Sequence, residues 1–167
     1  GNSGQCFEVV LGGAEAATLV FMVNRDMDGR RVPMDTQVVD TGYGLERLTW
    51  LSQGTTSAYE AVFGDTLVSL KRMADVKRVD DRVLQEYSKV AGMTKVESMA
   101  DVRAIHARTA ERLGMTAEEL AEQTAPLQAL YTICDHARAL LFLLGDGVVP
   151  SNSREGYFAR LLVRRGL

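Results

Sequence analysis

Residues 37–48 read QVVDTGYGLERL, and this stretch decides the fold. Two valines precede the sequence Asp-Thr-Gly at 40–42, which is typical of the end of a strand. After Gly44 the leucines recur at a helical spacing, at Leu45, Leu48 and Leu51. Because the period of the apolar pattern changes at Gly42 and Gly44, the stretch predicts a strand that passes directly into a helix. Gly54 is expected to end that helix.

Three β-rich runs precede this helix and predict an antiparallel sheet. They are CFEVVLG at 6–12, ATLVFMVN at 17–24 and VPMDTQVVD at 32–40. The second run is almost wholly apolar, as expected of a strand buried on both faces. Asp-Gly within DMDG at 26–29 predicts the turn of a hairpin between the second and third runs.

The chain after residue 57 reads as helices. One is expected from Met99 to Leu113, and Thr116-Ala-Glu-Glu119 is a capping box that opens the next. Pro126 is expected to kink or restart that helix. Residues 127–144 predict a central helix with a wide apolar face, and YFARLLVRR at 157–165 predicts the last one. The expected fold class is α+β, a short antiparallel sheet followed by a helical bundle.

Composition narrows the function classes for this chain of 167 residues. The formal net charge of −3 argues against bulk attraction to nucleic acid, although a local basic patch remains possible. No apolar run reaches the ~20 residues that span a bilayer, so no membrane partner is expected. Two cysteines, Cys6 and Cys134, make neither a disulfide framework nor a metal-ligand spacing and are expected to be packing residues in a reducing cytoplasm. Two histidines are too few for a zinc cluster, and no metal ligand is expected.

The stretch 37–48 also carries chemistry. Asp40 offers a carboxylate for a cation, and Arg47 lies in the first turn of the predicted helix, where free N–H groups already favour anions. The two glycines allow a ligand to approach the backbone. A plainer interpretation explains these residues equally well as turn formers and a solvated helix face. An aspartic protease would also use Asp-Thr-Gly, but it needs two such loops and a nearly all-β chain.

The motif GYGLER at 42–47 resembles motif 3 of the class II aminoacyl-tRNA synthetases. The longer VVDTGYGLERL resembles the alanyl-tRNA synthetase family within that class, on its archaeal side. GQCFEVV at 4–10 and ATLVFM at 17–22 look like the strand after motif 2 and the next core strand. ICDHARALLFLLGDGVVPSNSREGYFARLLVRR at 133–165 is similar to the family's central helix and the loop that follows.

This resemblance implies a domain organisation. Residues 1–57 would be the C-terminal part of the catalytic (adenylation) domain, and 58–167 the helical domain that recognises tRNA. Motif 1 and motif 2, with its arginine, would precede the first residue. The chain is therefore expected to be a fragment, inactive alone, whose partners include the remaining domains of the parent synthetase. The implied substrates are alanine, ATP with Mg²⁺, and the acceptor stem of tRNA(Ala).

The resemblance also implies roles for individual residues. Asp40 would hold the ammonium group of alanine as a fixed anion rather than act as a general base, with Gly42 and Val20 beside it. Arg47 would be the catalytic arginine on the ATP phosphates. Gly44 and Glu8 are also expected at ATP, while a solvated strand edge is an equal alternative for Glu8. Thr18 replaces an asparagine of the bacterial members, and its role stays open.

The helical part would carry the contacts with tRNA, at Asn152, Arg160, Arg164 and Arg165. Asn152 is expected to accept a hydrogen bond from an exposed guanine amino group in the minor groove. Pro150-Ser151-Asn152 also suits an N-cap of the last helix, a role that is compatible with the first. Two other classes stay open for the chain, a non-catalytic helical RNA-binding module and the aspartic protease.

Overall fold

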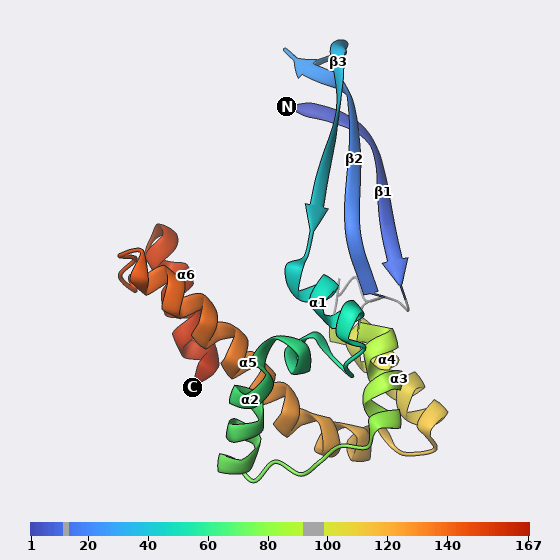
Figure 1. Cartoon of the computed structure of the whole chain (residues 1–167), viewed down its shortest axis with the longest axis vertical. Helices are drawn as coiled ribbons and strands as arrows, with labels where there is room; N and C mark the ends of the chain where they lie inside the picture. The colour runs from blue at the N-terminus through green and yellow to red at the C-terminus, as the bar shows by residue number, and fades with distance from the viewer. Residues whose placement is uncertain (12–13, 92–98) are drawn as a thin grey trace. The chain divides into compact units, whose positions relative to one another are not determined.

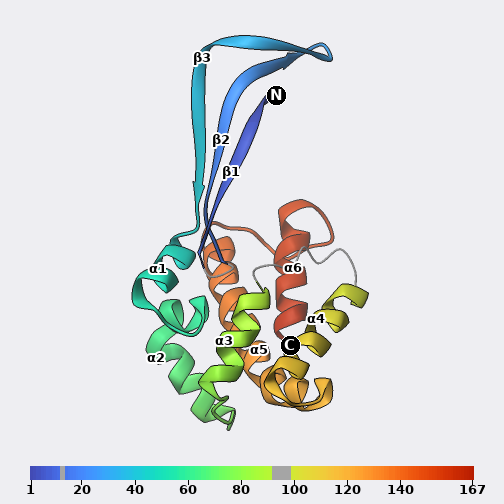
Figure 2. The same cartoon turned by 90° about the vertical axis from the view of Figure 1, so that its right-hand side faces the viewer.

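The β-rich runs at the start of the chain form one antiparallel sheet in the computed structural model, which describes residues 1–11, 14–91 and 99–167. The strands are β1 (Asn2–Leu11), β2 (Ala14–Met27) and β3 (Arg30–Tyr43), in the order β1-β2-β3 (Figures 1 and 2). The predicted end of the first strand, Gly12, lies outside the described residues. At the β2–β3 hairpin, Asp28 and Gly29 have φ of 50° and 76°. Positive φ at both central residues is the turn that suits the twist of a hairpin, so this prediction is confirmed.

The central strand is less buried than its apolar sequence predicts. Leu19 and Val20 are half-buried, and Phe21 is exposed. Phe7 of β1 meets Phe21 edge to face, with 6.0 Å between the ring centroids. The expectation of burial on both faces is wrong for this chain, because an apolar strand becomes buried only where another layer of structure covers the sheet.

The strand-to-helix passage occurs where the sequence predicts it. Helix α1 (Leu45–Gln53) has Gly44 as its N-cap, and the N–H of Leu48 donates to the carbonyl of Gly44 at 2.9 Å. Gly54 ends the helix in the left-handed region, with φ of 64°, and its N–H donates to the carbonyl of Trp50. Helix α1 packs against β2.

The remaining helices are α2 (Ala58–Met73), α3 (Asp81–Ala91), α4 (Met99–Leu113), α5 (Ala117–Gly145) and α6 (Arg154–Gly166). Gly64 interrupts α2 with a non-helical backbone, φ 40° and ψ −119°. The predicted α+β fold class is confirmed by the sheet and these helices. No helix in the described ranges is long and apolar enough to cross a membrane.

Helix α5 opens with the predicted capping box. The Thr116 hydroxyl accepts from the N–H of Glu119 at 3.1 Å, and the Glu119 carboxylate accepts from the N–H of Thr116 at 2.7 Å. Pro126 lies inside α5, so the helix does not restart there. Because proline lacks an N–H, its effect is the loss of one hydrogen bond, to the carbonyl of Glu122, rather than the end of the helix.

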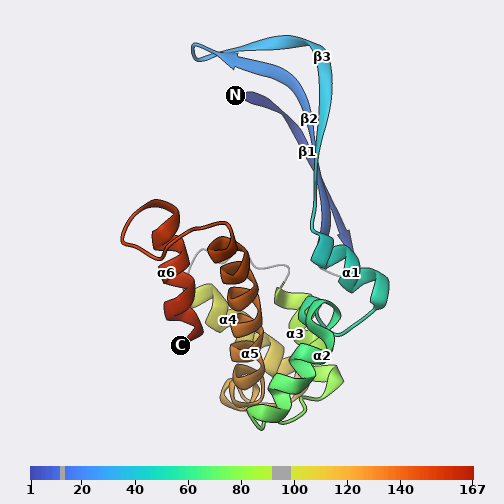
Figure 3. The ribbon, with the colours of Figure 1, turned by 60° about the vertical axis from the view of Figure 1, so that its left-hand side comes forward.

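The described chain divides into two compact units, 1–62 with 81–105 and 63–80 with 106–167. The second unit has a core of Leu67, Leu130 and Cys134, while α5 and α6 run side by side (Figure 3). The apolar face predicted for 127–144 is buried only in part, since Leu141 and Leu144 are 70% and 48% exposed. The boundary predicted at 57/58 concerns the domains of a larger synthetase and stays a prediction.

Candidate functional site

The strand register brings the predicted site residues of the sheet to one face. Val20 pairs with Asp40, and two residues further along Thr18 pairs with Gly42 on one side and Glu8 on the other. Directly opposed residues of an antiparallel pair point to the same face, and so do residues two apart on one strand. Glu8, Thr18, Val20, Asp40 and Gly42 therefore share one face, here called the site face.

A β-bulge adds Glu15 to the site face. The pairing passes from Val9 opposite Ala17 to Val10 opposite Glu15, so Ala16 has no partner on β1. An extra residue shifts the alternation of side chains by one position. Glu15 therefore points to the same face as Thr18, although three positions separate them in a strand of period two. Ala16 and Ala17 are both buried, which fits side chains that turn away from this face together.

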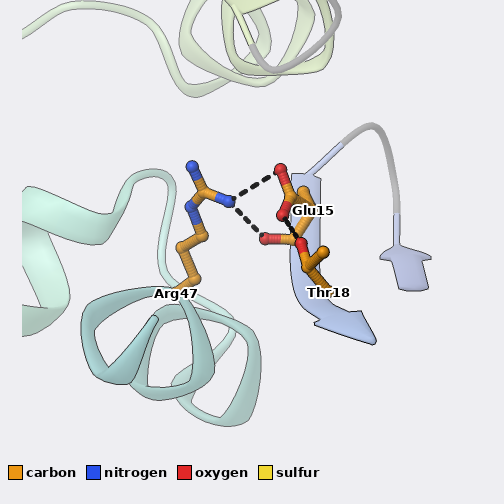
Figure 4. A network of polar contacts seen from close by, with 3 residues as sticks. All are labelled: Glu15, Thr18 and Arg47. Atoms are coloured by element: carbon orange, nitrogen blue, oxygen red, sulfur yellow. Dashed lines mark hydrogen bonds and ion pairs between the residues drawn. The ribbon is translucent and has the colours of Figure 1, made fainter. Parts of the chain in front are cut away.

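Arg47 of α1 is tied to this bulge (Figure 4). Its Nη1 donates to the main-chain carbonyl of Glu15 at 2.9 Å and lies 3.3 Å from the Glu15 carboxylate oxygen Oε2. The Thr18 hydroxyl donates to the other carboxylate oxygen, Oε1. The hydrogen bond from Thr18, together with the hydrogen bond and charge of Arg47, outweighs partial desolvation and lowers the pKa of Glu15. Glu15 is therefore an ionised partner of Arg47 at neutral pH.

The two glycines of the predicted motif have different surroundings. A Cβ at Gly44 would lie 3.2 Å from Cδ and 3.3 Å from Cγ of Arg47, tighter than most real contacts. A Cβ at Gly42 would meet nothing within 4 Å. Glycine at position 44 thus leaves room for the stem of Arg47, whereas the space above Gly42 is open on the site face.

Asp40 differs from its predicted position in one respect. The sequence predicts that it ends a strand, but β3 continues through Gly42 to Tyr43, because these residues still pair with β2. Asp40 is exposed, and it has no hydrogen-bond or ion-pair partner among the described residues. Its carboxylate is thus open to a cation from solution.

Sequence reasoning missed Glu15 and left the role of Thr18 open. Both belong to the Arg47 network, and both depend on the bulge at Ala16. The one signal in the sequence is an acidic residue at the start of an otherwise apolar strand, which strand alternation alone would place on the wrong face.

A second cluster of predicted residues lies in the helical unit. Nη1 of Arg160 donates to Oδ1 of Asn152, so these two predicted tRNA contacts are in contact with each other. Arg164 and Arg165 are exposed in the last turn of α6, where positive charge suits the helix dipole. The N-cap of α6 is Ser153, without a side-chain cap hydrogen bond. The expectation that Asn152 caps the last helix is therefore wrong.

The loop before α6 is held closely to the helix by Gly156. A Cβ on this buried glycine would lie 2.3 Å from the Ser151 hydroxyl oxygen and 2.4 Å from the main-chain oxygen of Val149. The N–H of Ser151 also donates to the Gly156 carbonyl at 2.9 Å. This close approach fixes the backbone on both sides of Asn152.

The two cysteines have different environments. Cys134 is buried in the helical core, and burial raises the pKa of its thiol. Cys6 is exposed, opposite Val20 on the site face, so the expectation of a packing role is wrong for Cys6 in this chain. Across the described residues, no group of three His, Cys, Asp or Glu side chains is placed to hold a metal ion.

The whole length of the chain is similar to known proteins. A family model described as tRNA synthetases class II (A) matches residues 1–167. The alanine–tRNA ligase of Pyrococcus furiosus is 49% identical over 180 residues, covering 100% of this chain and 20% of that protein. The alanine–tRNA ligase of Methanothermobacter thermautotrophicus is 48% identical over 168 residues, covering 100% and 19%. The chain thus spans about one fifth of the length of these relatives, and it belongs to the class II (A) tRNA synthetases.

Proposed function

We propose that the full-length protein carrying this chain is an alanine–tRNA ligase, and that the sheet and α1 form part of its adenylation site. The observation that carries this proposal is the site face, where Asp40, Val20, Gly42 and Glu8 lie together and Arg47 is anchored beside them. The names of the relatives support alanine as the amino acid.

In this proposal Asp40 and Arg47 each bind a different substrate, because they carry opposite charges. The open carboxylate of Asp40 pairs with the ammonium group of alanine, and Val20 and the open space at Gly42 receive its methyl group and backbone. Arg47 binds ATP phosphate oxygens, with Gly44 and Glu8 nearby. Attack of the alanine carboxylate on phosphorus needs orientation and charge stabilisation rather than a protein base, so Asp40 stays ionised throughout. Mg²⁺ enters with the phosphates and neutralises part of their charge.

The helical unit is proposed to bind the acceptor stem of tRNA(Ala). Asn152 lies in a fixed loop for contact with a base edge, and Arg160, Arg164 and Arg165 are all exposed on α6. Arginines there neutralise backbone phosphates, although the chain has a net charge of −3. We place the protein in the cytoplasm, since Cys6 and Cys134 are both free thiols.

ATP–pyrophosphate exchange by the full-length protein tests this function. It is measured with alanine and, in separate reactions, with glycine or serine in its place. We expect exchange with alanine and much less with the other two. A non-catalytic RNA-binding module would bind tRNA and show no exchange with any amino acid. The 167-residue chain alone is expected to show no exchange, because the motif 2 arginine that the resemblance implies has no counterpart in it.

A further inference from the structure

We propose that Glu15 is a positioning residue for Arg47, and that the Thr18 hydroxyl fixes Glu15 in this role. The inference rests on the proposed function and adds to it the means by which the phosphate-binding arginine is oriented. It starts from the two oxygens of the Glu15 carboxylate, which are divided between two partners. Thr18 donates to Oε1, and Arg47 lies on Oε2 (Figure 4).

Only one nitrogen of the Arg47 guanidinium is held by Glu15. Nη1 makes both contacts with Glu15, one to the carbonyl oxygen and one to the carboxylate. Within the described part of the chain, Nε and Nη2 have no partner. These two nitrogens form one edge of the planar guanidinium, which matches two oxygens of a phosphate. Glu15 thus holds one end of the group and leaves a bidentate edge for the nucleotide.

The arginine would otherwise have considerable freedom. Its side chain is 50% exposed, and a long exposed side chain loses rotamer entropy when it binds an anion. A contact that is already made in the free protein reduces this loss. The bulge at Ala16 makes this contact possible, because it turns Glu15 to the face that carries Thr18.

Thr18→Val in the full-length protein is the most direct variant, because it removes the hydroxyl and keeps both charge and shape. Glu15→Gln is less informative, since it also removes a negative charge that repels phosphate. Thr18→Ser retains the hydroxyl and serves as the conservative variant. Thr36→Val makes the same chemical change on an exposed threonine of β3 that has no partner among the described residues, and it serves as the matched control.

Binding of inorganic tripolyphosphate and of ATP with Mg²⁺ is measured by calorimetry, alongside KM for ATP and for alanine in the exchange assay. We expect Thr18→Val to weaken tripolyphosphate binding and raise KM for ATP about tenfold or more, with KM for alanine and the melting temperature unchanged. Thr18→Ser and Thr36→Val should stay close to wild type. In an Arg47→Ala background, Thr18→Val should have no further effect, because Thr18 and Glu15 act through Arg47.

Additive effects of Thr18→Val and Arg47→Ala would overturn the proposal, as would unchanged anion binding in Thr18→Val. A lower melting temperature with equal changes for ATP and alanine would show a purely structural role and would also overturn it. Tripolyphosphate binding with the expected coupling but no alanine-dependent exchange would refute the proposed function and leave this inference standing. Alanine-dependent exchange with additive effects of Thr18→Val and Arg47→Ala would support the proposed function and refute this inference. If the wild-type protein bound neither tripolyphosphate nor ATP, the proposed function and this inference would both be wrong.

Discussion

At the scale of single residues, Asn152 and Arg160 are joined by a hydrogen bond. The Asn152 carbonyl oxygen has two lone pairs and accepts from Arg160 with one of them. The other lone pair and the two N–H groups of the amide have no partner in the part of the chain that the structure describes, so they are open to the proposed base edge. Because Arg160 fixes which way the amide points, we propose that it orients Asn152 in addition to neutralising phosphate.

We expect Asn152→Ala and Arg160→Ala to reduce discrimination between two acceptor stems that differ only in an exposed guanine amino group. The loss for the stem that carries the group should be ~1–3 kcal/mol, and for the other stem much smaller. Arg164→Ala should weaken both stems about equally and lower the salt dependence of binding, since its proposed contact is with backbone phosphate alone. The rate of alanine transfer to each stem by the full-length protein measures these effects. Equal losses on both stems for Asn152→Ala would contradict a role in base recognition.

Residue types alone draw attention to two residues of the candidate site. Asp40 and Arg47 stand out in the sequence because each brings a charge to a passage from strand to helix. Glu15 does not, because its direction is set by a bulge, and a bulge depends on the register between two strands rather than on local sequence. The contact between Arg160 and Asn152 joins a loop to a helix and was also not predicted.

At the scale of elements, the capping box of α5 has a measurable effect on stability. Thr116→Ala removes the hydroxyl that accepts from the N–H of Glu119, and we expect it to cost about 1 kcal/mol of the free energy of unfolding. Thr116→Ser keeps the acceptor and should cost much less. Urea unfolding followed by circular dichroism measures both variants. Equal stability of the alanine and serine variants would mean that the cap contributes nothing.

The loop before α6 gives a second test at this scale. Gly156→Ala would place a Cβ 2.4 Å from the main-chain oxygen of Val149, so loop and helix must separate. We expect a loss of roughly 1–3 kcal/mol, the usual cost of overpacking. Gly145→Ala is the control, because a Cβ at this last residue of α5 would meet nothing within 4 Å. Melting curves of the two variants should differ, and a Gly156→Ala variant as stable as Gly145→Ala would contradict the close packing.

Most elements follow from their sequence, and the exceptions have physical reasons. The Asp-Gly turn, the glycine at the end of α1 and the capping box all act locally, so the sequence predicts them correctly. Pro126 was expected to kink or restart its helix, and the restart does not occur, because the loss of one N–H is tolerated within the long helix α5. The exposure of Leu141 and of the sheet depends on whether other parts of a protein cover them, and a local sequence pattern does not reveal this.

At the scale of the whole molecule, the two cysteines should report which faces are covered. A thiol reagent reacts with the thiolate, and burial both shields Cys134 and raises the pKa of its thiol. We expect Cys6 to react rapidly in the folded chain, while Cys134 reacts only when the chain unfolds. Because the raised pKa favours the neutral thiol in the folded state, stability should fall as the pH rises through this pKa. Mass spectrometry after brief labelling identifies the modified residue, and faster labelling of Cys134 would contradict the described core.

The central claim is that the site face and Arg47 of α1 beside it hold two substrates through two opposite charges. The most direct measurement is the pair of KM values, for alanine and for ATP, in alanine-dependent ATP–pyrophosphate exchange by full-length Asp40→Asn and Arg47→Ala proteins. The account predicts that Asp40→Asn raises KM for alanine about tenfold or more, equivalent to at least roughly 1.4 kcal/mol, and leaves KM for ATP nearly unchanged. Arg47→Ala should raise KM for ATP and leave KM for alanine nearly unchanged. An Asp40→Asn protein with a raised KM for ATP and an unchanged KM for alanine would contradict the account.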